Sequence, residues 1–234
     1  MKHGLVLSLF PGIGLLDMAF EEAGFCVVRG PDLLWGGDIR RFHPPEGGFN
    51  GLIGGPPCQV HSSASEIAGT NAEDLIPEFV RVYREAKPQW VVMENVCGAI
   101  GHAGIPPEWG NPIMLRDFDC GGETARTRAF WLWPMSALAP CRTGISASPS
   151  VMATTWKRGK STSRYVGDKG FLPGDLPIPE YGRLQGCEPL AKHLMSHKAH
   201  LSRSSIIHVL GNGVPLAMGR VIAKAVYDAL NSAA

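Results

Sequence analysis

A cysteine at position 58 lies in a setting that suits a catalytic thiol. It follows the run Gly54-Gly55-Pro56-Pro57, which comes directly after the short apolar stretch Gly51-Leu52-Ile53, typical of a buried strand. The two prolines stiffen this turn, and the two glycines let other parts of the backbone approach it closely. Ligands of open α/β sheets bind beyond the carboxyl ends of strands, and reactive thiols lie in partly exposed settings. The flanking residues therefore favour Cys58 as a nucleophile over a buried structural cysteine.

Charged side chains lie next to two other predicted strands. Glu94 follows the apolar run at 90–93, and a carboxylate at a strand end can act as an acid or a hydrogen-bond donor. Arg126 and Arg128 precede the apolar run at 129–133. Residues two apart point to the same side of an extended backbone, so both guanidinium groups are expected to face one site. Taken alone, such a pair is more typical of an ordinary surface.

A glycine turn, Phe10-Pro11-Gly12-Ile13-Gly14, joins a predicted strand to a predicted helix. Glycines at such a turn let a ligand approach the backbone at the start of the helix. The turn lacks the third glycine of the G-x-G-x-x-G fingerprint of dinucleotide-binding proteins. After the next strand, Asp32 could accept hydrogen bonds from ribose hydroxyls, and Asp38 could accept one from an adenine amino group. Each aspartate is equally typical of a solvated loop.

The elements that must position these side chains alternate between strand and helix. Such alternation predicts an α/β fold with a largely parallel sheet that is covered by helices on both faces. From Pro134 to about Pro179 the pattern gives way to serine, threonine, proline, glycine and charged residues. Apolar periodicity predicts strands at 5–10, 25–28, 52–53, 90–93 and 129–133, and helices at 15–23, 75–86 and 214–230.

Composition narrows the classes of function. A chain of 234 residues with 44% hydrophobic residues is long enough for one sizeable domain, or for one domain with a small lobe. A net charge of +1 gives no overall attraction to nucleic acid, so a basic surface must be local. The six cysteines include no C-x-x-C pair, which argues against a zinc knuckle and fits a reducing cytoplasm. We find no signal-peptide pattern, and no apolar run approaches the roughly 20 residues of a membrane span.

Three histidines, His193, His197 and His200, have a spacing that could suit a metal ion. No cysteine or carboxylate completes a ligand set near them, and the His-Glu-x-x-His motif is absent. We therefore expect no metal. A solvated helix, or one that faces phosphates, explains these histidines better.

Together the motifs resemble those of the DNA cytosine-5 methyltransferase family, in the family order and nearly from end to end. One match alone would be weak, but several in order make chance implausible. The similar segments are 10–14 (first cofactor motif), 37–39 (adenine motif), 54–59 (nucleophile loop), 75–88 (fifth motif), 94–96 (sixth), 126–128 (eighth), 183–186 (ninth) and 211–215 (tenth).

The resemblance implies an enzyme that uses S-adenosylmethionine to methylate carbon 5 of a cytosine flipped out of double-stranded DNA. Cys58 would bond covalently to carbon 6, and Glu94 would bond the ring nitrogen N3 in its protonated form. Arg128 would hold the cytosine O2, and Arg126 would support the loop or a phosphate. The cofactor, released as S-adenosylhomocysteine, would be bound by Phe10, Gly12, Ile13, Gly14, Asp32, Asp38, Ile39, Pro57, Leu75, Asn212 and Val214.

The implied fold is a Rossmann-like S-adenosylmethionine-dependent methyltransferase fold with a small target-recognition lobe. We expect a catalytic and cofactor-binding domain at 1–133, the lobe at 134–204, and a C-terminal segment at 205–234 that packs back on the catalytic domain. Few side chains of so short a lobe can reach bases, which favours a short recognition sequence. The residues expected to contact DNA are Lys157, Arg158, Lys160, Arg164 and Arg183.

Two departures from the family pattern stand out. Asp32 and Asp38 are only six positions apart, so the helix that normally separates their motifs is lost, and the role of Asp32 at the ribose stays open. Thr124 stands where the family has a glutamine before the paired arginines.

Two other functions remain open: a tRNA cytosine-5 methyltransferase on the same scaffold, and a non-catalytic methyltransferase-like DNA-binding protein. The presence of Cys58, Glu94 and Arg128 argues against the second, because binding alone requires none of them. We expect a cytoplasmic monomer encoded by a prokaryote or a phage. Restriction-modification, phage self-protection and regulation all fit the sequence.

Overall fold

A six-stranded sheet forms the centre of the computed structural model, which describes residues 4–57, 73–134, 176–196 and 202–232. The strand order is β2-β1-β3-β4-β6-β5. Neighbours among β2, β1, β3 and β4 pair in parallel, whereas β6 is antiparallel to both β4 and β5. The parallel part agrees with the sequence-based expectation, and the antiparallel edge adds to it. The strands are β1 (Leu5–Leu9), β2 (Cys26–Arg29), β3 (Gly51–Gly54), β4 (Trp90–Asn95), β5 (Ile113–Arg116) and β6 (Thr127–Trp133).

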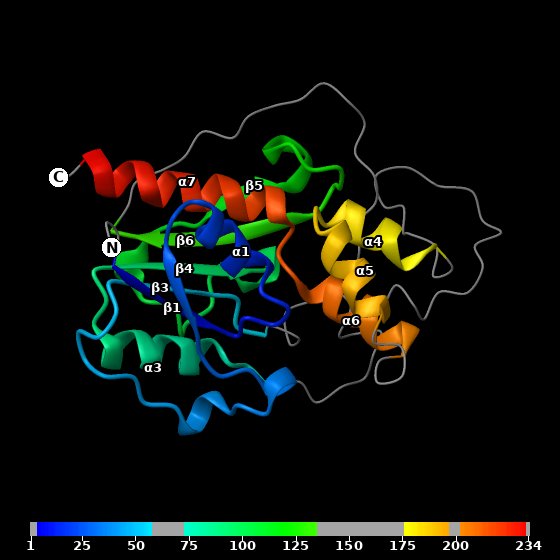
Figure 1. Cartoon of the computed structure of the whole chain (residues 1–234). Helices are drawn as coiled ribbons and strands as arrows, with labels where there is room; N and C mark the ends of the chain where they lie inside the picture. Colours follow the sequence, from blue (N-terminus) through cyan, green and yellow to red (C-terminus); the bar gives the residue numbers. More distant parts are fainter. Residues whose placement is uncertain (1–3, 58–72, 135–175, 197–201, 233–234) are drawn as a thin grey trace.

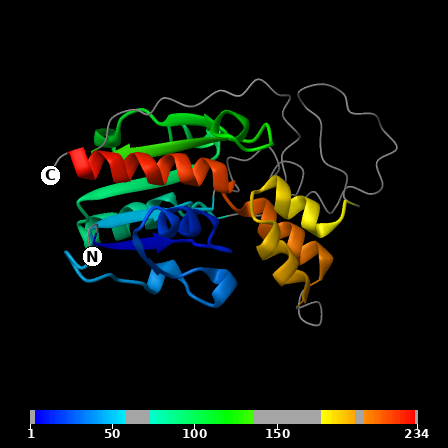
Figure 2. The same cartoon turned by 45° about the horizontal axis from the view of Figure 1, so that its top comes forward.

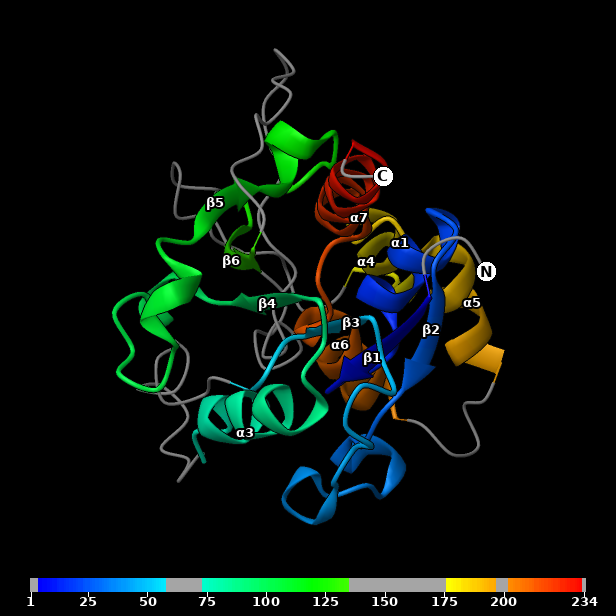
Figure 3. The same cartoon turned by 90° about the vertical axis from the view of Figure 1, so that its left-hand side faces the viewer.

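Helices cover both faces of the sheet (Figures 1 and 3). α1 (Leu15–Glu22) and α7 (Leu216–Ser232) pack together on one face, and α3 (Ile76–Ala86) lies on the other. The aromatic rings of Phe20 and Trp90 stack in the core on the α1 side. On the α3 side, Phe79 packs edge-on against Trp109. The sheet lies between the two apolar layers. Because β2, β1, β3 and β4 are parallel, their carboxyl ends share one edge of the sheet.

A cluster of three helices lies beyond that edge: α4 (Ile178–Leu184), α5 (Glu188–Ser196) and α6 (Arg203–Asn212) (Figure 2, yellow to orange). Tyr181 and Ile207 are buried within it, together with Leu15 at the start of α1. α6 crosses the boundary predicted between residues 204 and 205. Most of the predicted lobe at 134–204 lies outside the described residues, so its extent stays a prediction.

The stretch Arg203–Ser232 is long and apolar enough to cross a membrane by length and composition, since an 18-residue window within it has a mean hydropathy of 1.4. However, 61% of its most apolar window is buried inside the protein. It is also interrupted at 213–215, where α6 ends and α7 has not begun. These two helices therefore form core, with α6 in the helical cluster and α7 against α1.

Candidate functional site

The glycine turn after β1 is held by the carboxylate of Asp32. Its Oδ2 accepts a hydrogen bond from the Gly12 amide at 2.8 Å, and its Oδ1 accepts one from the Leu34 amide at 2.8 Å. The indole of Trp35 donates to the Gly12 carbonyl at 2.8 Å. Phe10 has a φ of 54°, a left-handed conformation that costs free energy in a non-glycine residue and that clusters at functional sites. Asp32, expected at the ribose, thus also organises the turn.

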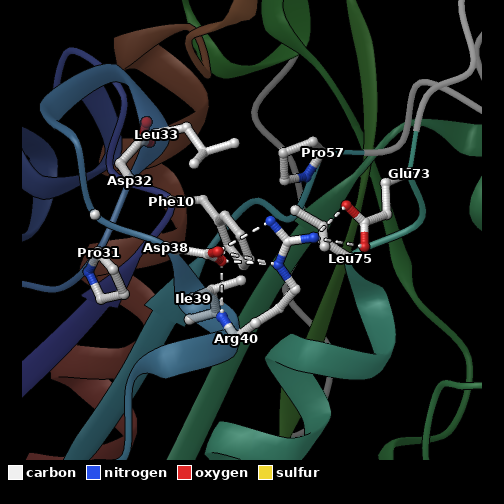
Figure 4. Close-up of a pocket in the computed structure, with 11 residues that line it drawn as sticks. Phe10, Pro31, Asp32, Leu33, Asp38, Ile39, Arg40, Pro57, Glu73 and Leu75 are labelled. Atoms are coloured by element: carbon white, nitrogen blue, oxygen red, sulfur yellow. Dashed lines mark hydrogen bonds and ion pairs between the residues drawn. The ribbon is translucent and has the colours of Figure 1, made fainter.

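A cavity of about 70 Å³ opens beside this turn, at the carboxyl ends of the parallel strands (Figure 4). Its wall combines the aromatic ring of Phe10 and the apolar side chains of Ile39 and Leu75 with the carboxylates of Asp32 and Asp38. The expected cofactor-binding residues that line it are Phe10, Asp32, Asp38, Ile39, Pro57 and Leu75, and the other lining residues are Pro31, Leu33, Gly37, Arg40 and Glu73.

The side chain of Arg40 crosses this cavity (Figure 4). Its Nε lies 2.9 Å from Oδ1 of Asp38, and its Nη1 lies 3.0 Å from Oε2 of Glu73. Hydrogen bonds from Arg40 hold the pKa of Asp38 below its usual value. Asp38, expected to accept from an adenine amino group, is therefore ion-paired in this structure. Neither Arg40 nor Glu73 was predicted from the sequence.

The other expected cofactor-binding residues do not line the cavity: Gly12, Ile13, Gly14, Asn212 and Val214. Ile13 packs on the helical cluster, and Val214 is buried in the core. The exposed Asn212 contacts the His208 ring at 3.1 Å. A Cβ at Gly213 would come 2.7 Å from Leu15, so the 211–215 segment lies beside the first residue of α1.

Glu94, near the carboxyl end of β4, faces both predicted arginines. Nε of Arg128 lies 2.8 Å from Oε1 of Glu94. Arg126 is buried with 5% of its surface exposed, and its charge also acts on Glu94. Burial raises the pKa of Glu94, while Arg128 and Arg126 act in the opposite direction. The antiparallel pairing of β4 with β6 thus brings one carboxylate and two guanidinium groups into one buried cluster.

The turn that leads to position 58 is fixed against the end of β4. A Cβ at Gly55 would come 2.6 Å from Oε2 of Glu94, so only glycine leaves room for this carboxylate. The side-chain amide Nδ2 of Asn95 donates to the Pro56 carbonyl at 3.2 Å, a contact that sequence reasoning missed. Cys58 itself lies outside the described residues. Its two preceding residues, Pro56 and Pro57, are described, and Pro57 lines the cavity.

Arg183, predicted to contact DNA, pairs with two carboxylates. Its Nη2 lies 2.6 Å from Oε1 of Glu180, and its Nη1 contacts Glu123 in the loop before β6. These two partners raise the pKa of Arg183. The pair with Glu123 links α4 to the loop that carries Arg126, and DNA contact by Arg183 stays a prediction. The other predicted DNA contacts, Lys157, Arg158, Lys160 and Arg164, lie outside the described residues.

Two buried polar residues that join neighbouring elements of the fold were also missed. Asp17, on α1, accepts a hydrogen bond from the Ser8 hydroxyl at 2.5 Å and pairs with Arg29 at 2.9 Å. Gln185, after α4, donates to the Leu210 carbonyl at 2.5 Å and so ties α4 to α6. A signal existed for Asp17, since it falls within an otherwise apolar helical run, where a charge requires a partner.

Comparisons with known proteins decide the family. A family model for C-5 cytosine-specific DNA methylases matches residues 36–104. The Type II methyltransferase M.HgiGI of Herpetosiphon aurantiacus is 32% identical over 116 residues, which cover 38% of this chain and 88% of that relative. The chain belongs to the C-5 cytosine-specific DNA methylase family.

Two other relatives are longer than the chain. The Type II methyltransferases M.NgoPII of Neisseria gonorrhoeae and M.FnuDI of Fusobacterium nucleatum are 31% and 34% identical, over 53% and 54% of this chain. The chain spans 42% of the first and 46% of the second, less than half of their length.

Solved structures show the same fold along nearly the whole chain. The Entamoeba histolytica methyltransferase EhMeth superposes with a TM-score of 0.68 at 14% identity, covering 98% of this chain and 99% of that one. A DNA modification methyltransferase candidate encoded within an E. coli prophage gives a TM-score of 0.64 at 19% identity, covering 97% and 99%. The expected methyltransferase fold is therefore confirmed.

Proposed function

We propose that this chain transfers a methyl group from S-adenosylmethionine to carbon 5 of a flipped cytosine in double-stranded DNA. The observation that carries the proposal is the buried cluster of Glu94, Arg126 and Arg128 against the turn that runs into Cys58. A protein that only bound DNA would have no need to bury a carboxylate between two arginines beside a cysteine-bearing turn. Membership of the C-5 cytosine-specific DNA methylase family supports the same reaction.

The first step forms a bond between the Cys58 sulfur and carbon 6 of the cytosine. Cysteine is the strongest side-chain nucleophile near neutral pH. The electron pair displaced from the carbon 5–carbon 6 double bond makes carbon 5 nucleophilic, and protonated Glu94 donates to N3 as negative charge develops on the ring. Burial raises the pKa of Glu94, which favours the protonated form that this donation requires. Carbon 5 would then bond to the methyl group that S-adenosylmethionine supplies, with S-adenosylhomocysteine as the leaving group. Loss of the carbon 5 proton would restore the carbon 5–carbon 6 double bond and release the Cys58 sulfur as a thiolate.

The arginines orient the ring. Arg128 would donate to the cytosine O2. Its guanidinium group already contacts Glu94, the residue proposed to bond the neighbouring ring atom N3. Arg126 is more deeply buried and has its positive charge close to Glu94. Arg126 would support the loop or a phosphate, and its charge adds to the positive potential that stabilises negative charge on the cytosine ring.

The cavity residues fit the nucleoside part of S-adenosylmethionine, which supplies the electrophilic methyl group when bound. Phe10, Ile39 and Leu75 offer a flat apolar surface, and Asp38 and Asp32 offer acceptors for an amino group and for hydroxyls. The volume of about 70 Å³ is too small for a nucleoside while Arg40 crosses the cavity, so Arg40 must move on binding. Gly12, Ile13, Gly14, Asn212 and Val214 stay predicted contacts.

DNA recognition is assigned to the segment at 134–204, where the basic residues Lys157 and Arg158 are predicted to contact phosphates. Phosphate contacts release counterions, so each lost contact lowers the salt dependence of binding by about one unit of slope. Lys157→Ala and Arg158→Ala should each weaken binding to duplex DNA and flatten the plot of log affinity against log salt. An unchanged slope in both variants would exclude this segment from the interface.

We place the protein in the cytoplasm of a bacterium or of a phage-infected cell, as a modification enzyme that acts as a monomer. The relatives named above are Type II methyltransferases of bacteria, and another is the orphan methyltransferase M.SPRI of Bacillus phage SPR, 31% identical over 121 residues.

A covalent trap tests the proposed reaction. In 5-fluorocytosine a fluorine stands where cytosine has the proton that carbon 5 must lose. The methylated adduct therefore cannot eliminate, and the enzyme should stay bound to the duplex in the presence of S-adenosylmethionine. We expect a denaturation-resistant adduct with the wild-type chain, none with Cys58→Ser, and a normal adduct with the control Cys26→Ser, which changes an exposed cysteine on β2. The absence of a Cys58-dependent adduct across varied sequence contexts would overturn the proposal. Labelled methyl transfer to tRNA but not to duplex DNA would reassign the substrate.

A further inference from the structure

Arg81, on α3, is hydrogen-bonded to the turn that forms one wall of the cavity. Its Nη2 donates to the Ile39 carbonyl at 2.8 Å, and its Nη1 donates to the Phe42 carbonyl at 3.1 Å. These two carbonyls flank the short 3₁₀ turn Ile39–Arg41. A planar guanidinium group can donate from both of its terminal nitrogens at once, so the single side chain of Arg81 spans the turn.

Two carboxylates of α3 hold the Arg81 side chain in this position. Its Nε lies 2.8 Å from Oε2 of Glu78, and its Nη1 lies 2.8 Å from Oε1 of Glu85. These partners come three positions before and four positions after Arg81, so they lie on the same side of the helix. All three nitrogens of the guanidinium group therefore have acceptors, and the orientation of the group is fixed from both sides. The side chain is 26% exposed, so water shields these contacts only in part.

The turn that Arg81 spans also lines the cavity. Asp38, Ile39 and Arg40 are all lining residues, and Figure 4 shows them together at the cavity. The backbone of the turn continues directly from Asp38, whose carbonyl accepts from the Arg41 amide at 3.1 Å and whose carboxylate accepts from the Arg40 amide at 3.1 Å. The position of Asp38, the acceptor proposed for an adenine amino group, therefore depends on the position of this turn.

The segment between β2 and β3 has little apolar burial to hold it in place. Residues 30–50, all of which the structure describes, form two 3₁₀ turns and no α-helix. Within the second turn, Ile39 is the only buried residue. The first turn exposes 46% to 68% of each of its apolar residues, Leu33, Leu34 and Trp35. Hydrogen bonds from α3 are therefore a main support of the second turn.

We propose that Arg81 is a positioning residue for the cofactor: it holds the turn after Asp38 so that Asp38 and Ile39 face the adenine of S-adenosylmethionine. The proposal rests on the proposed function, because it takes the cavity as the site of that cofactor. Arg81 does not line the cavity. It acts through the backbone carbonyls of Ile39 and Phe42 on the residues that do.

The test measures binding of S-adenosylmethionine to the full chain by titration calorimetry, together with the kinetics of methyl transfer. Arg81→Met keeps an apolar stem and removes every donor. A turn that holds the binding arrangement about one-tenth of the time weakens binding about tenfold, so we expect that rise in the dissociation constant and in KM for the cofactor. The kcat at saturating cofactor and KM for DNA should stay unchanged, because the bound cofactor itself holds the turn. S-adenosylhomocysteine has the same nucleoside, and its binding should weaken by the same factor.

Two further variants sharpen the comparison. The matched control is Arg84→Met, which removes an exposed arginine from the last turn of the same helix and should bind the cofactor as the wild type does. Arg81→Lys keeps a positive charge between Glu78 and Glu85 but presents one nitrogen where arginine presents three. It should weaken binding to an extent between the wild type and Arg81→Met.

The outcomes separate a positioning role from a merely structural one. If Arg81→Met melts at a lower temperature but binds both ligands as the wild type does well below that temperature, the inference is overturned and the proposed function stands. A fall in kcat with unchanged dissociation constants also overturns it. A wild-type chain that binds no S-adenosylmethionine overturns the proposed function itself. If Arg81→Met fails to fold, Arg81→Lys decides: weaker binding supports the inference, and a wild-type dissociation constant overturns it.

Discussion

The Nε atom of Arg128 lies 2.8 Å from Oε1 of Glu94, and this pair is largely shielded from water, with 17% and 11% of the two side chains exposed. Two opposing effects act on the carboxylate. Burial disfavours its charged form, and the guanidinium groups of Arg128 and Arg126 favour it. Burial is the larger effect, so the pKa of Glu94 lies above its usual value. The pair therefore combines a group that can hold a proton with a cation ready to support charge on a substrate.

We expect Glu94→Gln to lower the rate of methyl transfer by about 10²- to 10⁴-fold, the range that general acids contribute. The protonated form of Glu94 is populated below its raised pKa, so wild-type kcat should fall as pH rises through that value. Glutamine does not titrate, and the residual activity of Glu94→Gln should lose this limb. Single-turnover transfer measured from pH 5.5 to 9.5 checks both points. The matched control is the exposed Glu108→Gln, which should match the wild type, whereas a limb that persists in Glu94→Gln would assign it to another group.

Two adjacent glycines should have separable effects. A Cβ at Gly55 would meet the flexible end of Glu94 at 2.6 Å, whereas a Cβ at Gly54 would meet the Leu9 carbonyl of the neighbouring strand at 2.3 Å. We expect Gly55→Ala to displace the Glu94 carboxylate and lower kcat at least tenfold with little change in melting temperature. Gly54→Ala should separate β3 from β1 and destabilise the fold by about 1–3 kcal/mol, as overpacking does. Calorimetry and kinetics on both variants test this, and equal losses of stability would contradict it.

The sequence predicted the part of the fold that follows from local pattern. Apolar runs located β1, β2, β3, β4 and β6, and they also pointed to Glu94 near the end of β4 and to the glycine turn after β1. β5 was missed because its run has three apolar residues, of which Met114 is 42% exposed. Only its antiparallel pairing with β6 makes it a strand. Such tertiary contacts leave no local periodicity.

The helical cluster and several polar contacts between distant residues could not be predicted from the sequence for a related reason. α4 has only 7 residues, and it contains Gly182, a poor helix former, in its body. Gly182 is there because a Cβ would come 2.3 Å from Cβ of Ala191, so close packing of α4 on α5 requires it. Likewise, the spacing of Asp117 and Thr124 does not indicate that the Thr124 hydroxyl donates a hydrogen bond to the Asp117 carboxylate. Arg40 and Glu73 are 33 positions apart and meet only in the folded chain.

Ser8→Ala should destabilise the protein in a pH-dependent way. The Ser8 hydroxyl donates to the buried Asp17 carboxylate at 2.5 Å, and hydrogen bonds to charged groups contribute about 1.5–3 kcal/mol. Burial raises the pKa of Asp17 above 3.8, and Ser8 opposes that rise. Without Ser8 the folded-state pKa climbs further, so the folded chain holds its proton more tightly than the unfolded chain does. The loss should therefore be small near pH 3.5 and should grow as pH rises.

Urea unfolding from pH 3.5 to 8 measures this difference. The matched control is Ser232→Ala, because Ser232 is exposed and its hydroxyl donates to a backbone carbonyl in the last turn of α7. A constant difference between Ser8→Ala and the wild type across the pH range would show that the hydroxyl acts through packing rather than through the charge of Asp17.

Arg40→Ala should strengthen cofactor binding. The Arg40 side chain fills a cavity that retains only about 70 Å³ and holds Asp38 in an ion pair, so binding must break that pair and displace the side chain. Exposed ion pairs contribute little to stability, so removing this one should lower the dissociation constant of S-adenosylmethionine only up to about fivefold. Titration calorimetry on the full chain measures the effect, with the exposed neighbour Arg41→Ala as the control that should bind as the wild type does. Binding tenfold weaker in Arg40→Ala alone would mean that Arg40 contacts the ligand and shapes the pocket rather than obstructing it.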